Sequence, residues 1–187
     1  MFGTAAAAIF LVANLSGGTG PCLAEDTYEP AWTEVCAEWL DGAPAYSASV
    51  RDLSPYMVML AHYEGKWVMQ TIFNASERGV PVDDIRRNRI EVSDEDAQSI
   101  VALMDEPTLE KLAAQPYFGP GDHICVGGSR YELAMARDGQ RYAAATHSCA
   151  GRGELHVISD AFRELAMKYD PEFGKVRGGF TVSPDAS

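Results

Sequence analysis

Positive charge is scarce in this sequence. Its 15 lysines and arginines stand against 27 aspartates and glutamates, which gives a formal net charge of −12. An acidic surface repels the phosphates of nucleic acids and the headgroups of anionic lipids. We therefore expect no nucleic-acid partner. A basic protein partner and simple solubility are both compatible with such a surface.

The local motifs of several enzyme classes are also absent. The sequence contains no Gly-x-Ser-x-Gly, no His-Glu-x-x-His, no calcium-loop spacing, no dinucleotide glycine fingerprint and no Cys-x-x-Cys. Residues 17–20 (Gly-Gly-Thr-Gly) follow an apolar run as a phosphate loop would, but the lysine that reaches the phosphates is missing. We expect no cofactor and favour a non-catalytic protein, although sites assembled from distant residues leave no local motif.

No lysine or arginine precedes Arg51, so the positive segment that usually begins a signal peptide is missing. Residues 5–15 nevertheless form an apolar run of the length of a signal-peptide core, too short to span a bilayer of about 30 Å. Cys22 and Ala24 provide small residues at the −3 and −1 positions of a cleavage site. We expect residues 1–24 to be a signal peptide and the mature protein to be periplasmic or secreted. A start further upstream, or an α-amine that supplies the positive charge alone, would explain the missing segment. The alternative to a signal peptide is a buried N-terminal helix.

The chain length suits one domain. The roughly 160 residues left after processing would bury about 70% of the surface of the unfolded chain. A composition of 47% hydrophobic and 22% charged residues is typical of globular proteins. We expect a single α+β domain over 25–173, a mostly irregular tail over 174–187, and no stable membrane span after processing.

Two hairpins are predicted from turn signals between apolar runs. Glu64-Gly65 separates 56–63 from 66–73, and Asp138-Gly139 separates 130–137 from 141–148. Both faces of the first hairpin are apolar, so we expect it near the centre of an antiparallel sheet, covered on both sides. One face of the second hairpin carries large residues, and its other face carries alanines that would let another segment approach closely: Ala134, Ala136, Ala143 and Ala145.

Helical spacing predicts the remaining elements. Short helices are expected over 30–41, after the N-cap residue Ser93, and from Pro107, and a longer helix at least over 159–169. Residues 47–53 suit a strand, and 155–158 suit either a strand or the first turns of the last helix. Residues 74–92 are predicted to be mostly a connection whose arginines are neutralised by nearby acids. The predicted fold is therefore an antiparallel sheet built from two hairpins, packed with three to four helices and clamped by a disulfide.

The most distinctive pattern is a repeated His-x-Cys, at His123-Ile124-Cys125 and His147-Ser148-Cys149. Residues two apart in a strand share a face, so each pair would present an imidazole and a sulfur together. The Asp138-Gly139 turn brings Cys149 opposite about residue 128. We predict a Cys125–Cys149 disulfide, which would close a loop of about 25 residues and contribute roughly 3 kcal/mol. The alternative is a tetrahedral zinc site made of His123, Cys125, His147 and Cys149.

The other cysteine and histidines suggest structural roles. Cys36 lies on the apolar stripe of the first predicted helix, where it is either a buried thiol or a partner in another disulfide. His62 is expected opposite Trp67 in the first hairpin, as a stacked pair. His156 lies near the start of the last helix without an identified partner.

These observations favour an exported, acidic, non-catalytic binding or inhibitory protein with an unidentified protein partner. A small metal-binding protein or hydrolase that uses the His/Cys cluster is one alternative, and a structural component of the cell envelope is another. A deep pocket with convergent polar groups would favour an enzyme, and a flat apolar patch would favour a binder of proteins.

Overall fold

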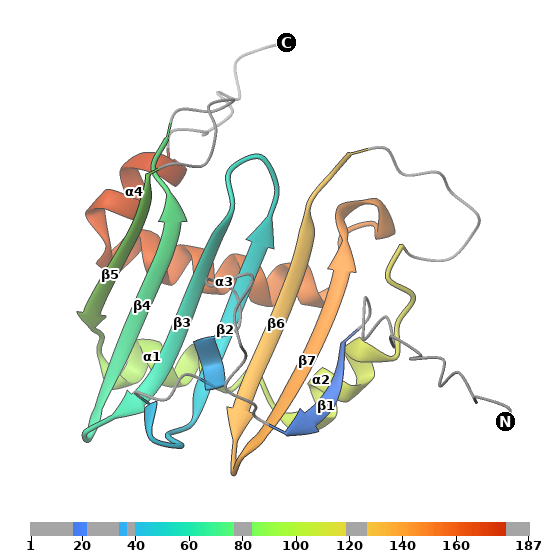
Figure 1. Cartoon of the computed structure of the whole chain (residues 1–187), viewed down its shortest axis with the longest axis horizontal. Helices are drawn as coiled ribbons and strands as arrows, with labels where there is room; N and C mark the ends of the chain where they lie inside the picture. The colour runs from blue at the N-terminus through green and yellow to red at the C-terminus, as the bar shows by residue number, and fades with distance from the viewer. Residues whose placement is uncertain (1–16, 22–33, 37–39, 77–83, 119–126, 179–187) are drawn as a thin grey trace, which may run out of the picture.

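The protein has an antiparallel sheet with helices packed against it, which confirms the α+β class. The structure, a computed structural model, describes residues 17–21, 34–36, 40–76, 84–118 and 127–178 (Figure 1). The sheet is seven-stranded, in the order β1-β7-β6-β2-β3-β4-β5. It is larger than two hairpins, because β1, β2 and β5 join it.

The strands are β1 (Gly17–Pro21), β2 (Ala45–Arg51), β3 (Tyr56–Tyr63), β4 (Lys66–Asn74), β5 (Ile85–Glu91), β6 (Arg130–Arg137) and β7 (Gln140–His147). The helices are α1 (Asp94–Val101), α2 (Glu106–Ala113), α3 (Glu154–Tyr169) and α4 (Pro171–Gly178). Two short 3₁₀ turns are η1 (Glu34–Cys36) and η3 (Ser148–Ala150). The long helix α3 crosses behind the strands in Figure 1.

The two predicted turns set the register of β3–β4 and β6–β7. Glu64 and Gly65 have φ of 51° and 77°, and Asp138 and Gly139 have φ of 52° and 74°. Positive φ at both central residues is the geometry of a two-residue turn whose twist matches the strands. His62 consequently pairs with Trp67, with ring centroids 5.1 Å apart, as the sequence predicted.

Both faces of β3 are buried, because a separate core lies on each side of the sheet. Val58 and Leu60 belong to the core under the helices, together with Phe162 of α3. Met57 and Met59 face the opposite core, where Val35 of η1 also packs. The predicted central position of this hairpin is therefore confirmed, with β2 and β4 on either side of β3. The alanine face of β6 and β7 contributes to that second core, through Ala134, Ala136 and Ala143.

The prediction of a connection over 74–92 is wrong for residues 85–91, which form β5 at the edge of the sheet. The strand was missed because most of its residues are charged. Arg86 bonds Asp84 at 2.7 Å, Arg89 bonds Gln70 at 2.9 Å, and Lys66 bonds Glu91 at 2.7 Å. Charged side chains on an edge strand discourage pairing with another molecule.

The helices differ from the predicted ones mainly at their ends. Ser93 caps α1 as predicted, and its Oγ accepts a hydrogen bond from the Asp96 amide at 3.2 Å. Residues 155–158 belong to the first turns of α3. Helix α4 runs from Pro171 to Gly178, so the first five residues of the tail predicted to be mostly irregular are helical, while 179–187 lie outside the described residues. Within 30–41 the 3₁₀ turn η1 is described, while 30–33 and 37–39 lie outside the described residues.

Over the ranges that the structure describes, no helix is both long and apolar enough to cross a membrane. Strand β1 lies within the predicted signal peptide and pairs with β7, Gly17 opposite Ala144 and Pro21 opposite Gln140. The rest of that predicted segment, 1–16 and 22–24, is outside the described residues.

Candidate ligand cavity

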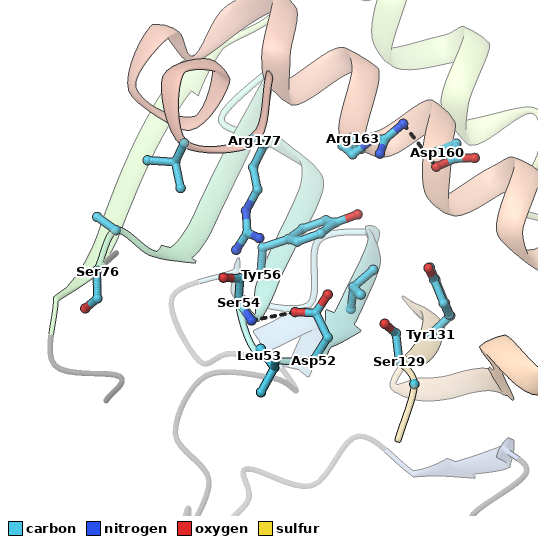
Figure 2. A pocket seen from close by; sticks show the side chains of 14 residues that line it. Asp52, Leu53, Ser54, Tyr56, Ser76, Ser129, Tyr131, Asp160, Arg163 and Arg177 are labelled. Atoms are coloured by element: carbon cyan, nitrogen blue, oxygen red, sulfur yellow. Dashed lines mark hydrogen bonds and ion pairs between the residues drawn. The ribbon is translucent and has the colours of Figure 1, made fainter. Parts of the chain in front are cut away.

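A cavity of about 700 Å³ lies at the end of the sheet where β2 ends and β3 begins, with α3 and α4 along one side (Figure 2). Its walls combine apolar, aromatic and charged side chains from five parts of the chain. The lining residues are Val50, Asp52, Leu53, Ser54, Tyr56, Ala75, Ser76, Gly128, Ser129, Tyr131, Asp160, Arg163, Val176 and Arg177.

The β2–β3 connection supplies the rim. The Asp52 carboxylate accepts a hydrogen bond from the Ser54 amide at 2.7 Å, a local turn that holds the connection in shape. Leu53, between them, is 73% exposed. An apolar side chain this exposed at the mouth of a cavity offers a contact to the apolar part of a ligand.

Arg177 reaches into the cavity from α4, towards Tyr56 and the β2–β3 connection (Figure 2). Its Nη2 donates to the Pro55 carbonyl at 2.9 Å, and its Cζ lies 4.9 Å from the centroid of the Tyr56 ring. Burial lowers the pKa of Arg177 from its ordinary value, and the Asp52 carboxylate opposes that shift. The guanidinium is thus a cation that has lost much of its hydration.

Tyr56 is a neutral wall of the cavity. Burial, its largest influence, raises the pKa of Tyr56 to about 12. Its ring packs edge-to-face on Phe173 of α4, with centroids 5.5 Å apart. At neutral pH the phenol keeps its proton, so it offers a hydrogen-bond donor and a π face but no base.

Helix α4 is held in place by Asp170, which is 1% exposed. One carboxylate oxygen accepts from the amides of Glu172 and Phe173, both at 3.0 Å, which caps the helix. The other accepts from Thr71 at 2.5 Å and from Asn88 at 3.0 Å, which ties the helix to β4 and β5. These bonds fix the helix that carries Arg177.

The α3 wall carries Arg163 and Asp160, three residues apart and therefore on one helix face. Arg163 Nη2 lies 3.3 Å from Asp160 Oδ1, and Arg152 Nη2 lies 2.6 Å from Asp160 Oδ2. The Asp160 carboxylate thus has two arginine partners. Within the described residues, Arg177 forms no ion pair of this kind.

The β6 wall carries Tyr131, whose ring lies 4.5 Å from that of His156 on α3. His156 Nδ1 accepts from the Gly153 amide at 3.2 Å, so this histidine caps its own helix. Burial, the largest influence, lowers the pKa of His156, which favours the neutral ring. The structure thereby gives His156 the partner that the sequence did not identify.

The His-x-Cys pattern does not persist as two residues on one strand face, because β7 ends at His147 and Cys149 lies in η3. His147 packs against Phe118 with centroids 5.2 Å apart, and its Nδ1 accepts from the Cys149 amide at 3.3 Å. His123 and Cys125 lie outside the described residues, so the Cys125–Cys149 disulfide and the zinc site stay predictions. Among the described residues there is no group of three His, Cys, Asp or Glu suited to a metal.

Cys36 and Cys149 are both disulfide-bonded. The interpretation of Cys36 as a free buried thiol is therefore wrong. A bonded Cys149 has no thiolate to give to zinc, which counts against the metal alternative.

Comparisons of this chain with protein-family models, with curated proteins and with solved structures find no match. The functional argument therefore rests on the chemistry of the cavity.

Proposed function

We propose that this chain is an exported binding protein that holds a small molecule in the cavity between the sheet end, α3 and α4. The cavity of about 700 Å³ is the observation that carries this proposal. Pockets for small molecules typically measure about 300–1,000 Å³ and combine apolar walls with a few polar groups. The mixture of Val50, Tyr56, Tyr131 and Arg177 has that character.

The lining chemistry supports binding rather than catalysis. Ser54, Ser76 and Ser129 supply hydroxyls, but the lining that the structure describes includes no histidine to activate them. The phenol of Tyr56 stays protonated at neutral pH. Because no histidine belongs to the described lining, we prefer a binding protein to an enzyme.

The protein surface also favours a small-molecule ligand over a protein target. The exposed large apolar side chains of the described residues come from different helices, strands and connections: Leu53, Ile85, Leu103, Phe118 and Val157. A protein interface of standard size needs a contiguous, well-packed surface. A small molecule needs only the cavity.

Export to the periplasm or the medium is the proposed location. The apolar run over 5–15 motivates it, and the disulfides at Cys36 and Cys149 belong to an oxidising compartment. The acidic surface would keep such a protein soluble.

Recovery of the native ligand tests this function. The protein is purified from its own compartment without denaturation, and small molecules released by acid are identified by mass spectrometry. We expect a compound near one equivalent. Ser129→Trp, which fills the cavity, should lose that compound, while Ser99→Trp, which adds the same bulk on an exposed face of α1, should keep it. Equal recovery from both variants, or no compound and no thermal shift across a metabolite library, would exclude the proposal.

A further inference from the structure

The charge balance of the cavity indicates the class of ligand. Two arginines and two aspartates line it, in a chain whose net charge is −12. Asp160 already forms ion pairs with Arg163 and Arg152, so these two arginines have a carboxylate partner within the protein. Arg177 is different, because its one hydrogen bond in the described residues is to a neutral carbonyl, that of Pro55.

Arg177 has unused capacity for an anion. A guanidinium has five N–H donors in a planar fork, and a carboxylate accepts two of them at once. Its Nε is buried and has no hydrogen-bond partner within the described residues. A cation that has lost hydration without gaining a carboxylate gains more from an incoming anion than one exposed to water.

The aspartates limit the charge of that anion. Asp160 is shared by two arginines, but Asp52 lines the same cavity as Arg177 and has no arginine ion pair within the described residues, so a dianion such as a phosphate monoester would be repelled more strongly by Asp52 than a monoanion would. A single negative charge beside Arg177 meets the least repulsion. This balance favours a carboxylate over a phosphate.

Apolar and aromatic side chains also line the cavity, with Ser129 beside Tyr131 (Figure 2). Val50 and Tyr131 belong to neighbouring strands, where they form a cross-strand pair on the same face of the sheet. Leu53 stands exposed at the rim. A ligand with one charged end and an apolar body matches both Arg177 and these side chains.

We propose that the ligand is a small organic monocarboxylate, with its carboxylate on the guanidinium of Arg177 and its apolar or aromatic body against Val50, Tyr131 and Leu53. This class of ligand rests on the proposed binding function of the same cavity.

Calorimetric titration of the full chain with matched probes tests the proposal. The probes are benzoate, 4-phenylbutyrate and octanoate, each beside its primary amide, with inorganic phosphate as the dianion. At least one carboxylate should bind, and its amide should bind at least tenfold more weakly. Equal affinity for acid and amide, or preferential binding of phosphate, overturns the carboxylate assignment.

Variants locate the charged end. Arg177→Gln should weaken carboxylate binding tenfold or more, and Arg177→Lys should weaken it less because the charge is kept. Arg86→Gln, which removes a charge from an exposed arginine on β5, should leave binding unchanged. Carboxylate binding that survives Arg177→Gln would place the anion elsewhere.

A rim variant keeps the test valid if Arg177 variants fold poorly. Leu53 is 73% exposed, so Leu53→Glu should leave the fold intact. It should lower carboxylate affinity severalfold without lowering that of the amides. If the native ligand is recovered but proves neutral or basic, the monocarboxylate class fails while the binding function stands.

Discussion

At the scale of single residues, Asp170 joins more of the structure than its position between two helices suggests. Its carboxylate accepts from Thr71 on β4, Asn88 on β5 and two amides of α4. Burial, the largest single influence, acts to raise the pKa of Asp170. The hydrogen bonds from Thr71, Phe173, Asn88 and Glu172 together outweigh burial, so the pKa lies below its ordinary value. The charged form is therefore the one that the fold stabilises.

Removal of this carboxylate should weaken the whole domain. We expect Asp170→Ala to lower the free energy of unfolding by about 3 kcal/mol, because the Thr71 hydroxyl is left buried without its partner. Urea unfolding at pH 7 measures the loss. Asp84→Ala, which removes a carboxylate from an exposed pair, should change stability by less than about 1 kcal/mol. A similar loss in both variants would contradict the role given to Asp170.

The lowered pKa of Asp170 also predicts that the stability of the fold depends on pH. A carboxylate whose pKa is lower in the folded state stabilises the fold above its unfolded pKa, and this contribution disappears as the pH falls through the folded value. Wild-type stability should therefore begin to fall below about pH 4. Asp170→Asn should show a shallower fall over that range. Parallel curves of unfolding free energy against pH for the two proteins would refute this linkage.

Gly128 is a residue that the wall of the cavity requires. It has φ of +98°, and a Cβ there would lie 2.5 Å from Ser148 Oγ and 2.7 Å from His147 Cε1. We expect Gly128→Ala to destabilise the protein by about 1–3 kcal/mol. Gly127→Ala is the matched control, since Gly127 also has a positive φ but an added Cβ would meet nothing within 4 Å. Thermal unfolding should show the larger loss at 128, and equal losses would attribute the effect to φ alone.

At the scale of elements, β3 should be the most protected strand. It has hydrogen-bonded strands on both sides and a core on each face. Hydrogen exchange should find the amides of Val58 and Leu60 among the slowest, with those of Val68 and Ile72 on β4, because exposing them requires opening the sheet centre. Slow exchange confined to α1–α4 would overturn this order of stability.

The elements that the sequence predicted are those specified by nearby residues. Acidic-Gly turns placed both hairpins in the correct register, and Ser93 placed the start of α1. Helix α4 had a local signal as well, since Asp170-Pro171 is a cap followed by the residue that suits a first turn. The glycines at 174 and 178 nevertheless led to the prediction of a mostly irregular tail. Strand β5 has weak apolar alternation, so its pairing with β4 decides its structure.

The cavity had no comparable signal. Asp52, Tyr131 and Arg177 are far apart in the sequence, and each residue is ordinary by itself. The fold brings them together only when β2, β6 and α4 reach the same end of the molecule. The His-x-Cys pattern drew attention because it is local, whereas the site proposed here depends on long-range packing.

At the scale of the whole molecule, charge argues against nucleic acid. The chain has a net charge of −12, and the arginines of β5 that the sequence singled out have acidic or amide neighbours such as Asp84, Gln70 and Glu172. We expect no binding to DNA or RNA at about 0.15 M salt, because few cations are left to neutralise phosphates. Fluorescence anisotropy with labelled oligonucleotides checks this expectation. Micromolar affinity would contradict it.

The disulfide pattern and the start of the mature protein are linked. Cleavage after Ala24 leaves three cysteines, and because Cys36 and Cys149 are both bonded, they would then have to bond each other within one chain. A chain that keeps Cys22 instead permits Cys22–Cys36 and Cys125–Cys149. Turn η1 packs against β2, β3 and β6, whereas Cys149 follows the end of β7, so we expect the second pattern.

Peptide mapping of the unreduced exported protein, with sequencing of its N-terminus, decides between them. The expected result is two linked pairs and an N-terminus before Cys22. A start at Glu25 together with a Cys36–Cys149 cross-link would show that the original cleavage prediction was correct. Either result also identifies whether Cys125 is free to be alkylated.

The pairing of β1 with β7 has a consequence for how the protein behaves in solution. The five residues Gly17–Pro21 pair with Gln140–Ala144, so the backbone of β7 that faces away from β6 is hydrogen-bonded within the molecule. In a shortened chain that starts at Glu25, those amides and carbonyls would face water and any other extended strand. The β7 strands of two such chains could then pair through backbone hydrogen bonds. Loss of β1 would replace an edge strand of five residues by the eight-residue β7, and we expect this longer edge to increase self-association.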